Sequence, residues 1–317
     1  MRKRNSDPTS GVDTGFGVKA NNVGSRFISK KGKANIETRG VGFFAKISWY
    51  HSLLELSIAK FFLFIFIFFI AINILFATLY FLIGVENINV SPELSIPEQF
   101  VDAFFFSCQT FTTVGYGNLN PMNIPANFLA SIEALIGWLS LAVSTSLLYG
   151  KFAQPAAYLK FSANALISPY KNGTALMLRV APYKNTSLIN AQAHVSLALK
   201  VEENGELLNK FYELPLEISF VNSLSLSWTI VHPITEESPL YNFDKLDYEK
   251  SKGEIIIFIK AFDDMFSGDV VARTSYIFRE IIYGAKFLPM FFRSKEGKKT
   301  VLDLSKLNHF AVAPISE

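Results

Sequence analysis

The chain has 317 residues, of which half are hydrophobic and 31 are Phe, and its formal net charge is +3. This composition is too apolar for an ordinary soluble protein. The charge is also segregated: residues 1–46 carry ten Lys or Arg against three Asp or Glu, whereas residues 61–150 carry no Lys or Arg. A cation-free stretch of this length, with Lys60 before it and Lys151 after it, predicts a membrane domain that starts and ends on the cytoplasmic side.

The segments before the membrane are predicted to be a tail and a surface helix. Residues 1–42 are basic, rich in Asn, Ser and Gly, and without hydrophobic periodicity, which indicates a cytoplasmic tail. Residues 43–57 mix Trp49 and Tyr50 with polar residues, which favours an amphipathic helix at the membrane interface. The alternative is a simple extension of the next helix. Residues 61–83 are apolar and long enough to span a bilayer core, at about 1.5 Å per residue.

A short helix and a glycine-containing loop follow. Residues 98–110, after Pro97, predict a helix too short to cross the bilayer. It leads to Thr113, Val114, Gly115, Tyr116 and Gly117. This TVGYG string is the one from which potassium selectivity filters are built, in which consecutive carbonyl oxygens replace the water around K⁺. Gly115 and Gly117 can adopt the left-handed backbone that such an arrangement requires.

Residues 126–150 predict a second spanning helix, so that the pore domain covers residues 58–154. The only charge in this helix is Glu133, and an intramembrane carboxylate is a functional candidate by default, here as a support behind the filter. Gly137 permits either close packing or a bend. The single cysteine, Cys108, is expected to have a packing role.

From residue 155 to residue 317 the pattern is that of a β-protein. Short apolar or alternating segments predict strands at 174–180, 195–201, 218–220, 224–231, 254–260 and 300–304. Asn204 and Gly205 are typical of a tight hairpin turn. The spacing predicts an immunoglobulin-like β-sandwich, not the alternating βαβ order of a ligand-sensing domain.

With these parts in place, the chain resembles the inward-rectifier potassium channel family, particularly its bacterial branch, from about residue 43 to about residue 303. The resemblance depends on the filter and its helix, on the end of the second spanning helix at 144–155, on Met177-Leu178-Arg179-Val180, and on the segment HPITEESPL at 232–240. It implies a homotetramer, and physics agrees, since one filter strand per chain cannot encircle an ion. It further implies passive K⁺ conduction in the cell membrane, with no cofactor and no structural metal.

The resemblance also assigns positions. Leu141 and Thr145 would line the pore, and Tyr149 would be the constriction, on one face of the second spanning helix. A core-packing role for Tyr149 is the alternative. The turn at Gly268 and Asp269 would narrow the cytoplasmic pore. Anionic lipid headgroups would contact Lys46, Lys60, Lys151 and Lys160.

Some positions depart from the family. Leu141 stands where strong rectifiers carry an acid that holds a blocking polyamine or magnesium, so weak rectification is expected. Gln109 and Leu119 stand where the family has an ion pair behind the filter. Asn118 stands where many channels have Asp. Because Asn is neutral, the outer mouth is expected to have a weaker negative potential.

Two other functions are alternatives to conduction through this pore. One is a two-helix potassium channel gated by a small ligand on the cytoplasmic domain, and another is a non-conducting, membrane-anchored interaction module. An enzyme is not predicted, because no nucleophile–base constellation or phosphate-binding loop is apparent. The cytoplasmic half has no basic excess for nucleic acid. His51 and His232 are candidate pH sensors.

Overall fold

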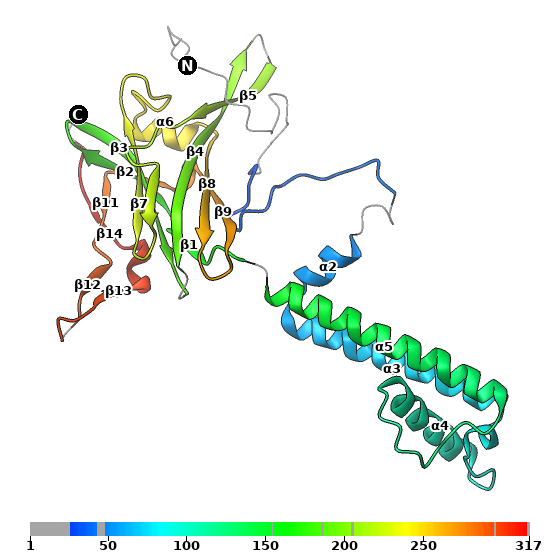
Figure 1. The fold of residues 1–317 in the computed structure, drawn as a ribbon. Coiled ribbons are helices and arrows are strands. Elements are labelled where there is room, and N and C mark those ends of the chain that lie inside the picture. Colours follow the sequence, from blue (N-terminus) through cyan, green and yellow to red (C-terminus); the bar gives the residue numbers. More distant parts are fainter. Residues whose placement is uncertain are drawn as a thin grey trace. The chain divides into compact units, whose positions relative to one another are not determined.

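The computed structural model describes residues 26–42, 48–153, 155–184, 187–203, 206–294 and 296–315, without the side chains of 51, 202–203 and 206–207. The chain divides into two compact units (Figure 1). Among the described residues, one is a helical unit within 39–153, and the other is a β unit in which residues 26–38 are grouped with residues between 155 and 315. Each unit has a hydrophobic core of its own.

The helical unit begins with a short helix that is separate from the one after it. Helix α2 (Trp49–Glu55) ends before Leu56 and Ser57, whose extended backbone precedes α3 (Ile58–Ile83). The alternative of one continuous helix is therefore wrong. Residues 43–47 of the predicted interfacial helix, with Lys46 among them, lie outside the described residues.

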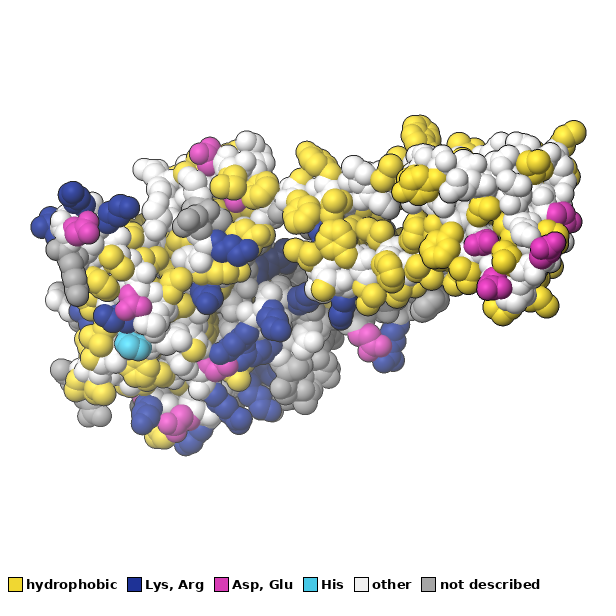
Figure 2. All heavy atoms as spheres, turned by 90° about the horizontal axis from the view of Figure 1, so that it is seen from below, with side chains coloured by type: hydrophobic (Ala, Val, Ile, Leu, Met, Phe, Trp, Pro, Cys, Tyr) yellow, Lys and Arg dark blue, Asp and Glu magenta, His cyan; other side chains and the backbone are white. Residues whose placement is uncertain are grey.

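Within the described part of the chain, α3 and α5 (Ile124–Phe152) are the two helices long and apolar enough to cross a membrane. Most of their large hydrophobic side chains are exposed in the single chain, unlike those of a buried helix in a soluble protein, and hydrophobic side chains cover the helical unit in Figure 2. Both helices start earlier than predicted because each has a polar cap. Ser57 accepts a hydrogen bond from the Lys60 amide, and Asn123 accepts one from the Ala126 amide.

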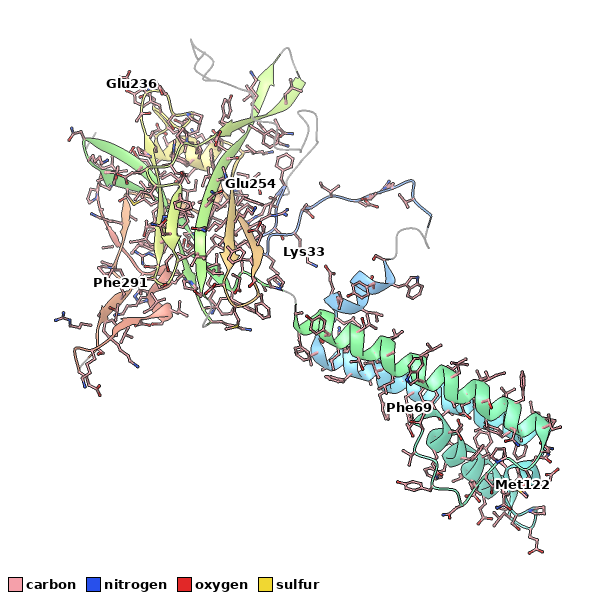
Figure 3. All side chains as sticks on the ribbon, viewed as in Figure 1. Lys33, Phe69, Met122, Glu236, Glu254 and Phe291 are labelled. Atoms are coloured by element: carbon pink, nitrogen blue, oxygen red, sulfur yellow. The ribbon has the colours of Figure 1, made fainter. Side chains whose placement is uncertain are left out.

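A re-entrant element lies between the two long helices in the sequence. The 3₁₀ turn η1 (Val85–Ile88) is followed by α4 (Ile96–Phe111), which starts two residues before the predicted helix because Ser95 and Glu98 form a capping box. Helix α4 packs against both α3 and α5. The rings of Tyr80 and Phe106 lie 4.9 Å apart, and those of Phe69 and Phe111 lie 5.8 Å apart. Phe69 is labelled in Figure 3.

The β unit contains two five-stranded sheets with a shared core. The first sheet has the order β1-β3-β2-β10, with β7 also paired to β3; its strands are β1 (Leu159–Phe161), β2 (Ala165–Tyr170), β3 (Gly173–Pro182), β7 (Trp228–Ile234) and β10 (Ile281–Tyr283). The second has the order β5-β4-β8-β9, with β6 also paired to β4; its strands are β4 (Leu188–Glu203), β5 (Glu206–Glu213), β6 (Phe220–Ser223), β8 (Gly253–Asp263) and β9 (Gly268–Ile277). Alternate residues of β4, Val195, Leu197 and Leu199, point into the core, as the sequence pattern indicated.

Smaller elements complete the unit. The two-stranded pairs are β11 (Ala285–Phe287) with β14 (Phe310–Val312), and β12 (Phe291–Arg293) with β13 (Thr300–Leu302). The short helices are α6 (Lys245–Lys250), η2 (Phe278–Glu280) and η3 (Leu304–Asn308). The prediction of two spanning helices followed by an all-β domain is confirmed.

The predicted strand 224–231 is wrong in its first half. Strand β7 begins only at Trp228. The segment before it alternates Leu and Ser as a strand would, but Leu224 is held by one hydrogen bond, from its amide to the Leu188 carbonyl at 2.8 Å, and not by a ladder. The predicted Asn204-Gly205 turn lies outside the described residues, although β4 and β5 pair as far as Glu203 and Glu206.

Residues 26–38, here called the strap, pack on the β unit although the sequence placed them in the tail. The backbone amides of Phe27 and Ile28 donate to the two carboxylate oxygens of Glu254 on β8, at 2.7 and 3.2 Å (Figure 3). Ser275 on β9 donates to the Ile28 carbonyl at 2.5 Å. Further ion pairs join the strap to η2, from Arg26 and Lys30 to Glu280. A buried carboxylate thus receives both of its backbone donors from a distant segment.

His232, a candidate pH sensor, is buried near the end of β7. Its Nδ1 lies 2.6 Å from the Pro215 carbonyl, which can only accept, so Nδ1 carries the proton. Its Nε2 then accepts from the Ser238 hydroxyl at 2.8 Å. Burial lowers the pKa of His232 below its ordinary value. The neutral ring is therefore the form that this site stabilises. The side chain of His51 lies outside the described residues.

We predict that His232 makes the β unit less stable in acid. Because its pKa is lower in the folded chain, the unfolded chain takes up the proton first, and stability is lost as the pH falls below about 6.5. The thermal midpoint of the purified protein should fall less between about pH 7.5 and about pH 5.5 in His232→Gln than in the wild type. His309→Gln, at an exposed position, is the control and should behave as wild type. Equal pH dependence in all three proteins would contradict the prediction.

Candidate functional site

The loop after α4 has an unusual backbone. Thr113, Gly115 and Gly117 have φ angles of 60°, 54° and 87°, whereas the two residues between them are not left-handed. In an ordinary strand successive carbonyls point in opposite directions, and a change of hand at every second residue cancels that alternation. Thr113 is not a glycine, so its conformation costs roughly 1–2 kcal/mol that the surroundings must offset.

The loop is attached to the end of α4 by its amides. Those of Val114 and Gly115 donate to the Gln109 carbonyl at 2.9 and 3.4 Å, and that of Thr113 donates to the Thr110 carbonyl at 3.1 Å. Within the described residues, no donor reaches the carbonyl oxygens of residues 113–117. The loop therefore presents a row of unpaired acceptors next to the negative end of a short helix.

Helix α5 holds the end of α4 by a close backbone approach. A Cβ at Gly137 would overlap the carbonyl of Phe111, the last residue of α4. Of the two roles that the sequence left open for Gly137, the structure shows packing. This contact lies directly before the loop, so it fixes where the loop begins.

Glu133 is completely buried and joins three helices. The Tyr80 hydroxyl of α3 donates to its Oε2 at 2.7 Å, and the Ser107 hydroxyl of α4 contacts its Oε1. Ser107 also lies 2.9 Å from Asn73 Oδ1 of α3. The sequence singled out Glu133 but not its partners. Asn73 and Tyr80 were visible as polar side chains within the mostly apolar α3, but they meet Ser107 and Glu133 only in the folded unit.

The predicted pore-lining residues lie on one exposed side of α5. Leu141 and Tyr149 are 67% and 75% exposed in the single chain, and Thr145 between them is also exposed. The predicted constriction adjoins α2, because a Cβ at Gly150 would lie 2.7 Å from the Tyr50 hydroxyl. Helix α2 is thus in contact with the end of α5, within the same unit.

The predicted lipid-contacting lysines differ in their surroundings. Lys151 is engaged by protein, since its ammonium donates to the carbonyl of Leu54, at 2.9 Å, and to that of Leu56, at the end of α2. Lys60 is exposed. Lys160 is exposed as well, with its ammonium 5.3 Å from the centre of the Tyr183 ring.

The predicted cytoplasmic loop is the turn between β8 and β9. Ser267 is left-handed, with φ of 48°, and Asp269 forms an ion pair with Lys260 at 2.7 Å. Asp263 shapes the turn by accepting from the Met265 amide at 2.9 Å. Among the described residues, no group of three His, Cys, Asp or Glu side chains could hold a metal ion.

Two apolar helices, a short helix between them and a TVGYG loop of alternating hand define the class of protein as a potassium-channel pore. Comparison with known proteins identifies the branch. Residues 159–316 match the family model "Inward rectifier potassium channel C-terminal domain", and residues 67–154 match the model "Ion channel". The chain belongs to the inward rectifier potassium channel family.

The similar proteins include bacterial and animal members. Inward rectifier potassium channel Kirbac3.1 of Paramagnetospirillum magnetotacticum is 35% identical over 293 residues, which cover 90% of this chain and 96% of that protein. Inward rectifier potassium channel 18 of Homo sapiens and ATP-sensitive inward rectifier potassium channel 12 of Bos taurus are each 26% identical over 306 residues, covering 87% of this chain and 68% and 69% of theirs. The predicted resemblance to this family is confirmed.

We predict that Gly137→Ala displaces the end of α4 and with it the filter. The added methyl group overlaps a backbone carbonyl, and overpacking of this kind costs about 1–3 kcal/mol, so the potassium-over-sodium flux ratio in liposomes should fall by at least about tenfold. Gly42→Ala, in the same unit but with open space around the added carbon, is the control and should keep the wild-type ratio. An unchanged ratio in Gly137→Ala would show that the contact does not position the filter.

Proposed function

We propose that four copies of the chain surround one selective pathway for K⁺. The observation that carries the proposal is the alternating hand of Thr113, Gly115 and Gly117, together with the unpaired carbonyl oxygens of residues 113–117. These oxygens, and the hydroxyl of Thr113, would replace the hydration shell of K⁺. The negative end of α4 would add to the attraction for a cation. K⁺ is the permeant ion, not a cofactor.

The tetramer follows from what a single chain lacks. Val114 and Tyr116 of the filter are 53% and 75% exposed in one chain, which leaves the loop without a second wall. A loop that lines a pathway at membrane depth must be buried in protein or face water inside a cavity. Identical copies arranged around a cyclic axis would bury the back of each loop in protein and enclose a pathway at its front. A homotetramer is therefore the assembly that we propose.

The distribution of cations supports an orientation. Lys60 and Lys151 bracket the two spanning helices, and the positive-inside rule places both brackets, and therefore both termini, in the cytoplasm. The protein would be multi-pass in the cell membrane, with residues 58–154 as the pore and residues 155–317 as the cytoplasmic domain. Acidic side chains gather at one end of the helical unit in Figure 2. We propose that this end faces the outside of the cell.

Gating would occur near the end of α5. Tyr149 is the bulkiest of the three exposed residues that we propose as pore lining, and a ring of four such side chains could exclude ions by dewetting. Helix α2 touches the neighbouring Gly150, so a shift of α2 at the membrane surface would move the constriction. The turn at Gly268 and Asp269 would form a second narrow point. Lys60 and Lys160 are free to meet anionic headgroups, whereas Lys151 would do so only by leaving its carbonyl partners.

We predict that purified protein in liposomes passes K⁺ and excludes Na⁺. Gly115→Ala should abolish the selectivity, because Ala at a φ of 54° costs roughly 1–2 kcal/mol in each of four chains. Cation-specific flux dyes measure both. Equal K⁺ and Na⁺ fluxes in the wild type, or none in any lipid composition or at any pH, would refute the proposed function.

We also predict weak rectification that one substitution converts to strong rectification. Leu141 provides no charge for a polyamine in the pore, so internal spermine at micromolar concentration should block the wild type weakly. Leu141→Asp places four carboxylates there and should increase the voltage-dependent block at least about tenfold. Leu141→Asn, of the same shape but neutral, is the control. Strong block of the wild type in patch recordings would contradict the prediction.

A further inference from the structure

The cluster around Glu133 contains more hydrogen-bond contacts than its hydroxyl groups can supply with protons. From this we propose that Glu133 is a neutral carboxylic acid whose O–H donates a hydrogen bond to Ser107. We further propose that Ser107, Asn73 and Tyr80 are positioning residues for the filter. The inference rests on the proposed function, because it concerns how that filter is held. It extends it by naming a protonation state and three further residues.

The cluster has one hydroxyl proton fewer than it has hydrogen-bond contacts. Three contacts connect the cluster: Tyr80 to Glu133, Ser107 to Glu133, and Ser107 to Asn73 Oδ1. Each contact between two oxygen atoms needs one proton. Tyr80 and Ser107 supply one each, which leaves one contact without a proton. An ionised carboxylate only accepts, so the third proton belongs to Glu133.

Among the described residues, the amide of Asn73 is the other group that could supply a proton to this cluster, and its orientation excludes this. If its amide were turned over, Nδ2 could donate to Ser107, and a carboxylate could then be accommodated. However, Nδ2 already donates to the Phe69 carbonyl at 2.7 Å. Turning the amide would place Oδ1 against that carbonyl, two acceptors in contact without a proton. The hydrogen bonds are therefore donated by Tyr80 to Glu133 Oε2, by Glu133 Oε1 to Ser107, and by Ser107 to Asn73 Oδ1.

The charges around the cluster agree with a neutral acid. Residues 61–150 contain no Lys or Arg that could pair with a carboxylate, and Glu133 is 0% exposed. The ionisable groups that face it are the Tyr80 hydroxyl from α3 and the Cys108 thiol from α4, and neither is a cation. An isolated buried charge is costly, and such groups neutralise instead.

The position of the cluster gives the neutral acid a purpose. Glu133 and Gly137 are one turn apart on α5, and their partners Ser107 and Phe111 are one turn apart on α4. The two helices are thus joined at two successive turns, once by a hydrogen bond and once by backbone packing. Tyr80 and Asn73 extend the first junction to α3. The last turn of α4, whose carbonyls accept the hydrogen bonds of the filter amides, is therefore held against both spanning helices.

Isosteric substitution tests the protonation state through conduction. In Glu133→Gln, the amide nitrogen can donate to Ser107 and the amide oxygen can accept from Tyr80, so the potassium-over-sodium flux ratio in liposomes should stay within about twofold of wild type. Glu133→Leu removes the hydrogen bonds to Ser107 and to Tyr80 and should lower the ratio at least about tenfold. Ser107→Ala should lower it too and serves if the Leu variant does not assemble. Ser131→Ala, whose hydroxyl bonds only within α5, is the control.

Infrared spectroscopy tests the proton directly and without conduction. At neutral pH the purified wild-type protein should show the carbonyl band of a hydrogen-bonded carboxylic acid, and Glu133→Gln should lack it. The same band in both proteins, or in neither, would overturn the proposal, as would a Glu133→Gln protein that fails to assemble or loses selectivity like Glu133→Leu. Because the band does not depend on ion flux, this result is distinguishable from failure of the proposed function.

Discussion

A chain segment that turns its carbonyl oxygens to one side gives up the hydrogen bonds that normally hold a backbone in place. Among the described residues, the loop at 113–117 is not part of a strand ladder. Three hydrogen bonds from its backbone amides attach it to the end of α4. Its geometry is therefore only as well defined as the position of α4. The capping box at Ser95, the packing at Gly137 and the cluster at Glu133 all act on that helix. The pore unit can be understood as the support of one short helix.

The two units are stabilised by different forces because their surroundings differ. In a bilayer, lipid tails are as apolar as the helix surfaces, so association depends on close backbone contact and on polar side chains between helices. Gly137 and Ser107 provide these two kinds of contact. In the β unit, two sheets bury aliphatic and aromatic side chains such as Leu197, Ile257 and Tyr276, which water drives together. The helical unit has few polar groups, but they decide its geometry.

The sequence predicted the features that depend on local pattern. The two long helices, the short helix and the filter follow from hydrophobic length, charge and one five-residue string, and the family follows from several motifs together. The errors arise where distant contacts override that pattern. Alternation before Trp228 looked like a strand, but in the folded chain Leu224 makes a single backbone hydrogen bond to Leu188 of β4, and β7 begins only at Trp228. Asn73 and Tyr80 looked like minor interruptions, because their partners are 34 and 53 residues away. The strap has no hydrophobic period at all, and a buried carboxylate on β8 binds its amides.

The strap also changes where the boundary of the β unit lies. A fragment that begins at residue 155 would keep both sheets but lose the chain that lies on β8 and β9. Glu254 would then lose its two amide donors, and Phe211 and Ile256 would lose the hydrophobic contacts of Phe27 and Ile28. Strand β9 is the last in its sheet, and an uncovered edge is a site for aggregation. A stable soluble preparation of the domain therefore requires residues from both sides of the membrane-spanning helices, joined by a linker or supplied as a peptide.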